Sequence, residues 1–130
     1  MRMNARLRDE FFAEQVAGYV EDEVCIVAFA ETSDPDPSRY AIFSESLYDD
    51  SQDEGEEGMS FSFEMAGIDV PPFASISLIS IAPDHLIVRG ANDTNAGIEV
   101  LIKYAPDHYS LLKEHMPKIV AKSSTRLEIQ

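Results

Sequence analysis

Alternation of apolar and polar residues dominates the middle of this chain and predicts β-strands. From residue 59 to 65, methionine and phenylalanine alternate with serine and glutamate, which places the apolar side chains on one face of a strand. The apolar run Val24–Ala30 is short, rich in β-branched residues and bounded by acids, which is typical of a buried central strand. Further strands are predicted at residues 40–45, 73–81, 85–90 and 98–104, with turns between them.

The N-terminal stretch allows two interpretations. Alternation over residues 10–19 indicates a first strand, while residues 9–20 could also form a short helix. Residues 34–38 contain two prolines, which lack a backbone donor and restrict the residues before them. A loop is therefore predicted between the second and third strands.

The last third of the chain predicts one helix. Pro106 and Asp107 suit a helix start, where unpaired N–H groups and the helix dipole favour a proline and an acid. Apolar residues then recur at three- and four-residue spacing: Tyr109, Leu112, Met116, Ile119 and Val120. Pro117 is expected to kink or shorten this helix. The tail beyond it is expected to be loose, with an edge strand through Leu127 and Ile129 as the alternative.

These elements together predict an α+β fold: an antiparallel β-meander of about seven strands with one C-terminal helix packed on the sheet. With 130 residues, 45% of them hydrophobic, the chain has the size of a single domain. We expect this domain to span residues 1–130, with a core at about residues 11–120 and flexible ends at residues 1–9 and 121–130.

Cysteine content and hydropathy bear on the compartment. The single cysteine, Cys25, excludes an internal disulfide framework and a zinc cluster built on cysteines, and it favours a reducing compartment. The N-terminus lacks the apolar core of a signal peptide, and no apolar run reaches the roughly 20 residues of a membrane-spanning helix. The sequence therefore predicts a cytoplasmic protein without a membrane partner.

Negative charge is concentrated in one part of the chain. The sequence has 24 acidic and 10 basic residues, and Arg39 is the single base between Asp9 and His85. The densest acidic stretch is residues 49–58, directly after Tyr48. Such a field repels a nucleic acid backbone, which needs cations to bind, and attracts a cationic protein. On composition alone, a solvated loop that aids solubility is the simpler explanation of this run.

The acidic stretch does not fit an EF-hand calcium loop. A loop that starts at Asp49 has Glu54 where glycine is required, and one that starts at Asp50 ends at Phe61 where a bidentate glutamate is required. Weak calcium binding by the carboxylates is left as an alternative. The chain has three histidines: His85, His108 and His115. Their spacing matches no known metal motif, so we predict no metal site.

No catalytic residues and no cofactor are predicted either. Cys25 lies in an apolar strand, where cysteine usually acts as a small hydrophobic residue with an unreactive thiol. The sequence has no nucleophile elbow, phosphate-binding glycine loop or dinucleotide fingerprint. A hydrolase built on acid pairs such as Asp49 and Asp53 would need a closed pocket in which they converge. We therefore expect a protein that is not an enzyme.

The order of features along the chain has a further implication. An apolar strand and a strand that begins with tyrosine precede the acidic residues 50–54, and an alternating strand behind Gly58, a long hairpin and a terminal helix follow. The most specific feature is the pair Gln52 and Asp53 upstream of that strand, while residues 70–75 replace an expected glycine-rich segment. This order resembles the immunity protein 10 family of bacterial polymorphic toxin systems.

The resemblance covers roughly residues 11–120 and implies a function. Members are encoded beside secreted toxins and protect the producing cell by binding and blocking the cognate toxin domain. The hypothesis is therefore an immunity protein that occludes a basic toxin, such as a nuclease. Its candidate partner-binding residues are Tyr48, Asp49, Asp50, Asp53, Glu54, Glu56 and Glu57. The alternative is a small acidic self-associating scaffold or structural domain without catalytic activity, which pairs through an exposed strand edge. The oligomeric state is left open.

Overall fold

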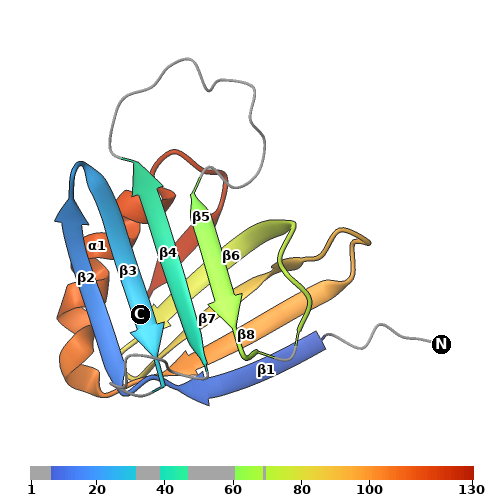
Figure 1. Ribbon diagram of the computed structural model, residues 1–130, viewed down its shortest axis with the longest axis horizontal. Coiled ribbons are helices and arrows are strands. Elements are labelled where there is room, and N and C mark those ends of the chain that lie inside the picture. The colour runs from blue at the N-terminus through green and yellow to red at the C-terminus, as the bar shows by residue number, and fades with distance from the viewer. Residues whose placement is uncertain (1–6, 32–38, 47–60, 69) are drawn as a thin grey trace.

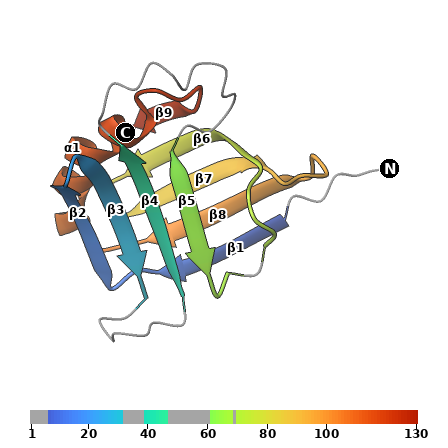
Figure 2. The ribbon, with the colours of Figure 1, turned by 45° about the horizontal axis from the view of Figure 1, so that its top comes forward.

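The computed structural model describes residues 7–31, 39–46, 61–68 and 70–130. In these residues the chain forms nine strands and one α-helix, and the strands make two sheets that pack face to face (Figure 1). The strands of one sheet cross those of the other (Figure 2). The predicted α+β class is therefore confirmed.

One sheet has five strands in the order β1-β8-β7-β6-β9. Their bounds are β1 (Leu7–Phe12), β6 (Ser75–Ala82), β7 (His85–Ala91), β8 (Gly97–Lys103) and β9 (Arg126–Ile129). The strands β6, β7 and β8 pair antiparallel, whereas the outer strands β1 and β9 pair parallel with β8 and β6. The expectation of a loose tail is therefore wrong for these residues, and the alternative, an edge strand through Leu127 and Ile129, is confirmed as β9.

The other sheet has four strands, each antiparallel to its neighbour in the chain. Their bounds are β2 (Gln15–Glu21), β3 (Val24–Ala30), β4 (Tyr40–Ser46) and β5 (Ser62–Ala66). In the central strand β3, Cys25, Val27 and Phe29 are fully buried, while the residues between them are half-buried on the opposite face. One face of this sheet therefore belongs to the core and the other faces outward.

The prediction of a single meander of about seven strands is wrong. Residues 10–19 form neither one strand nor a helix, because β1 ends at Phe12 and β2 begins at Gln15 in the other sheet. Between them Ala13 is fully buried, and its N–H donates to the carbonyl oxygen of Lys103 at 2.7 Å. This contact ties the chain to the five-stranded sheet at the point where it leaves for the other. No glycine or proline lies between the end of β1 and the start of β2. The sequence therefore does not indicate that the chain passes from one sheet to the other there.

The predicted helix is confirmed as α1 (Tyr109–Val120), which follows a 3-10 turn at Pro106–His108. Its buried residues match the predicted stripe, with a histidine in place of Tyr109: Leu112, His115, Met116, Ile119 and Val120. The helix contacts β2, β3 and β4 as well as β6 and β9, so it closes one end of the sandwich. It continues past Pro117, which is exposed and does not shorten it. No helix in the described part of the chain is long and apolar enough to cross a membrane.

A row of aromatic side chains joins the two sheets through the core. Tyr104 stacks on Phe29 with ring centroids 6.3 Å apart, and Phe29 meets Phe43 edge-on at 6.2 Å. The row continues from Phe43 to Phe63 at 4.4 Å and from Phe63 to Phe73 at 5.7 Å. Aromatic pairs of this kind contribute about 0.5–1.5 kcal/mol each beyond their burial, so the row fixes how one sheet sits on the other.

Candidate functional site

All seven candidate partner-binding residues lie outside the described residues, in the segment between β4 and β5: Tyr48, Asp49, Asp50, Asp53, Glu54, Glu56 and Glu57. The described strands show where this segment joins the fold. β4 ends at Ser46, which pairs with Val24 at the start of β3, and β5 begins at Ser62, which pairs with Ser44. The acidic segment therefore joins the end of the four-stranded sheet that carries the β2–β3 turn.

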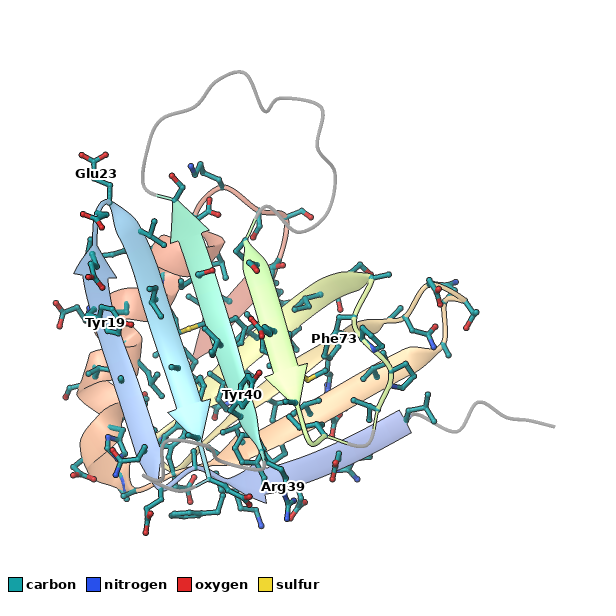
Figure 3. The ribbon with its side chains drawn as sticks, in the orientation of Figure 1. Tyr19, Glu23, Arg39, Tyr40 and Phe73 are labelled. Atoms are coloured by element: carbon teal, nitrogen blue, oxygen red, sulfur yellow. The ribbon has the colours of Figure 1, made fainter. Side chains whose placement is uncertain are left out.

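The β2–β3 turn adds exposed carboxylates at this end of the sheet. Asp22 and Glu23 form a two-residue turn with backbone φ angles of 53° and 63°, between the paired residues Glu21 and Val24. Asparagine and glycine adopt such positive angles more readily than aspartate and glutamate do. The three acids are all exposed, and Glu23 projects from the end of the sheet (Figure 3). Glu21, Asp22 and Glu23 together form the acidic end of the four-stranded sheet.

The outer face of the four-stranded sheet is largely apolar. Strand pairing places Tyr19 beside Ile26 and Ala28 beside Ile42, with all four directed away from the core. Six residues define this outer apolar patch: Ala17, Tyr19, Ile26, Ala28, Tyr40 and Ile42. Tyr19 is 43% exposed, and the others are exposed or half-buried. Because α1 and the five-stranded sheet lie on the inner side, no described element covers the patch (Figure 1, Figure 3).

Two polar contacts lie at the margin of the outer apolar patch. The Tyr40 hydroxyl donates to the Glu64 carboxylate across the β4–β5 pair, at 3.3 Å. At the end of the sheet away from Glu23, Arg39 forms an ion pair with Glu31 at 3.3 Å (Figure 3). Since Arg39 is the one base between residues 9 and 85, the positive charge of this part of the chain lies far from the acidic end.

The outer face of the five-stranded sheet is charge-balanced instead. Glu99, only 7% exposed, lies between Arg8 at 3.1 Å and Arg89 at 2.8 Å, and Lys103 pairs with Glu10 at 3.0 Å. At the acidic end, by contrast, no base of the described residues forms an ion pair with any of the three acids. On the outer face of the five-stranded sheet, Glu99 and Glu10 are therefore neutralised by arginine and lysine. The acids at the acidic end of the four-stranded sheet are not.

A hollow of about 360 Å³ lies on the outer side of the five-stranded sheet. It is lined by Phe12, Asp84, His85, Ile87, Leu101, Lys103 and Tyr104. The Nδ1 atom of His85 lies 2.8 Å from Oδ1 of Asp84, a contact that orients a histidine in many hydrolases. The residues that line the hollow include no serine, threonine or cysteine, however.

The tyrosine of this hollow is also unsuited to act as a nucleophile. The Tyr104 hydroxyl lies 2.7 Å from the carbonyl oxygen of Ala82 and 2.8 Å from that of His85. Burial, together with the nearby carboxylate of Asp84, raises the pKa of Tyr104, so the hydroxyl keeps its proton. The hollow therefore offers an apolar surface with an oriented histidine and no activated nucleophile of its own.

Interior polar groups serve to hold α1 in place. Cys25 is buried in β3, where burial raises the pKa of its thiol, and its sulfur lies 3.8 Å from the carbonyl oxygen of His115. His115 itself donates from Nδ1 to the carbonyl oxygen of Leu111 at 3.0 Å. Glu45, 6% exposed on the inner face of β4, pairs with Lys122 just beyond the helix at 3.4 Å. Among the described residues, no group of three or more histidine, cysteine, aspartate or glutamate side chains could hold a metal ion.

Two comparisons at the level of sequence give no relative. No family model matches this sequence, and no curated protein matches it. The resemblance to the immunity protein 10 family therefore stays a prediction from the order of sequence features.

Proposed function

We propose that this protein is a cytoplasmic immunity protein that binds a cognate bacterial toxin and blocks it by occlusion. It acts by binding and not by catalysis, and its partner is a basic toxin domain such as a nuclease. The observation that carries the proposal is the acidic end, whose exposed acids form no ion pair with a described base. The acidic residues 49–57 join the fold at this same end.

Electrostatics explains why this arrangement suits such a partner. A nuclease holds its polyanionic substrate with lysine and arginine, so a protein that covers the same surface needs carboxylates in place of phosphates. Complementary charge raises association rate constants from about 10⁵–10⁶ to as much as about 10⁸–10⁹ M⁻¹s⁻¹ at low salt. Close charge pairs in protein–inhibitor interfaces couple by roughly 1.5–7 kcal/mol, so a few well-placed acids suffice for strong binding.

Co-expression tests the function directly. The partner to use is the toxin domain encoded by the reading frame directly upstream, produced with and without this protein in the same host. We expect the toxin alone to stop growth, co-expression to restore it, and the two purified proteins to form a complex. A toxin that stays active in the presence of this protein, with no complex formed, would contradict the proposal.

Association kinetics test the role of the acids. We expect the on-rate to fall roughly tenfold or more between low and high salt, because ions screen the attraction between exposed charges. The triple variant Asp50→Asn, Asp53→Asn, Glu54→Gln should slow association at low salt. The matched control Asp93→Asn, Asp107→Asn, Glu114→Gln removes the same charge from exposed positions elsewhere and should have a small effect. An on-rate that is equal at low and high salt would show that the acids do not steer binding.

A further inference from the structure

We infer that the outer apolar patch of the four-stranded sheet is the docking surface for the toxin, and that the acidic end forms its charged rim. The occupant is a basic protein surface with an apolar centre. This inference rests on the proposed function and adds to it the location of the interface. The acidic stretch by itself leaves that location open.

The composition of the patch is that of an interface centre. Protein interfaces place aromatic and aliphatic side chains at the middle and polar groups at the margin. In this sheet Tyr19 on β2 is paired with Ile26 on β3, and Ile42 on β4, which is paired with Ala28, lies diagonally next to Ile26. Tyr40 adds a second aromatic ring, whose hydroxyl is held by Glu64. Such fixed aromatic side chains supply a large share of binding energy.

Charge identifies the kind of occupant. Glu21, Asp22 and Glu23 stand at one end of the patch, and Glu64 stands beside it on β5. A second copy of this chain carries the same excess of acid, 24 acidic against 10 basic residues, so docking two copies brings like net charge together, which costs free energy. Nucleic acids and anionic membranes are repelled for the same reason. The occupant must cover the apolar patch and carry positive charge opposite the acids at its margin. A protein with lysine and arginine around an apolar centre does both.

The size of the patch explains why the acidic end belongs to the same interface. With four strands about 4.8 Å apart and about 3.3 Å per residue, the whole outer face of the sheet, of which the patch is a part, measures roughly 20 Å by 23 Å, on the order of 450 Å². A standard stable interface buries about 800 Å² on each partner. The sheet face thus supplies a little more than half of what is needed. The acidic end provides adjacent surface.

Paired substitutions test the location of the interface. The variant Tyr19→Thr with Ile26→Thr removes two paired apolar side chains from the patch and keeps a β-branched residue on each strand. The matched control is Ile87→Thr with Leu101→Thr, a pair in the same relationship on the outer face of the five-stranded sheet. Against the toxin domain from the upstream reading frame, we expect roughly a hundredfold weaker binding for the first variant and less than about threefold for the control.

Circular dichroism and thermal unfolding must show that both variants fold. If either variant does not fold, methyl NMR on the wild-type protein tests the inference instead. In methyl NMR spectra, addition of the toxin domain should shift the signals of Ile26 and Ile42 and leave that of Ile87 in place. Unmoved signals from Ile26 and Ile42 in a saturated complex would overturn the inference.

The possible outcomes separate this inference from the proposed function. If the wild-type protein does not bind or neutralise the toxin, the proposed function is wrong and the inference falls with it. If it neutralises the toxin and the patch variant binds as tightly as the control, the function stands and the docking surface is wrong. Light scattering that shows a dimer of the free protein, lost in the patch variant, would assign the patch to self-association and also overturn the inference.

Discussion

Tyr40 on β4 and Glu64 on β5 are joined by a hydrogen bond of 3.3 Å on the outer face of the four-stranded sheet. Strand pairing sets Glu64 opposite Ile42 and Tyr40 opposite Ala66, so the contact is diagonal across the two strands. The tyrosine ring therefore leans across the sheet toward β5 and stays at the surface. This hydrogen bond thus holds both the Tyr40 ring and the Glu64 carboxylate at the margin of the outer apolar patch.

The two glycines Gly90 and Gly18 should respond very differently to alanine. A Cβ atom at Gly90 would lie 1.9 Å from the carbonyl oxygen of Ser75, which is backbone and cannot move aside. At Gly18 the nearest atom, at 2.7 Å, is the end of the flexible Leu111 side chain. We expect Gly90→Ala to lower the free energy of unfolding by about 3 kcal/mol or more, and Gly18→Ala to change it by about 1 kcal/mol or less.

Urea unfolding monitored by circular dichroism measures both values. Gly90 lies opposite Ile76, next to the irregularity in the pairing of β6 with β7, so its loss should disturb the hairpin at that point. Equal stability of the two variants would show that the β6–β7 backbone adjusts freely, and that the close approach at Gly90 is unimportant.

Glu99 should contribute more to stability than an exposed acid in a similar ion pair. Its carboxylate is almost buried between Arg8 and Arg89, so Glu99→Gln leaves two guanidinium groups without their shared partner. We expect a loss of about 1–2 kcal/mol, less than for a fully buried pair because both arginines reach solvent. The control Glu128→Gln breaks the exposed pair with Arg126 and should cost less than about 0.5 kcal/mol. Thermal unfolding at low and high salt compares them, and equal losses would contradict the prediction.

Sequence patterns predicted the features that depend on the spacing of apolar residues along a single strand or helix. The inward face is confirmed for residues 61–65, because Phe61 is buried and Phe63 packs on Phe43, whereas Met59 lies outside the described residues. The helix stripe is confirmed for the same reason. His115 was missed there, although it lies three residues after Leu112 on the same face, because a histidine was not expected in an apolar stripe.

Other features depend on contacts between distant residues and could not be predicted from spacing. The crossing from β1 to β2 is set by the hydrogen bond from Ala13 to Lys103, ninety residues later in the chain. The outer apolar patch also depends on strand pairing: Tyr19 and Ile26 look unremarkable in the sequence, and only their register places them side by side. The seven acidic-stretch candidates lie outside the described residues, so that part of the site stays a prediction.

Tyr104 should make the protein sensitive to alkaline pH. Because burial raises its pKa in the folded state, the unfolded chain loses this proton first as the pH rises past the ordinary value of about 10. The associated stability is fully present below pH 10 and is lost above it, at about 1.4 kcal/mol per pH unit at most. Tyr104→Phe should lower stability at pH 8 by about 1–2 kcal/mol, because two carbonyl groups lose their donor.

The same variant should lose less stability than the wild type between pH 9 and 11. Urea unfolding at pH 8, 9, 10 and 11 provides the comparison, and the Cys25 thiol, whose pKa is also raised, contributes equally to both proteins. Parallel curves for the wild type and Tyr104→Phe would show that ionisation of this tyrosine does not limit alkaline stability.

The β2–β3 turn should show a conflict between stability and binding. Asp22 and Glu23 both have positive φ angles, for which asparagine followed by glycine is the preferred pair. The variant Asp22→Asn with Glu23→Gly should therefore raise the free energy of unfolding by about 1 kcal/mol, since it relieves backbone strain at two positions. It also removes two carboxylates from the acidic end, so it should slow association with the toxin domain at low salt. The control Asp107→Asn with Glu114→Gln removes the same charge at exposed positions on and beside α1, away from the acidic end. Slowing by the turn variant alone would place the steering charge at the acidic end, whereas equal slowing by both would mean that net charge, and not its location, governs the encounter.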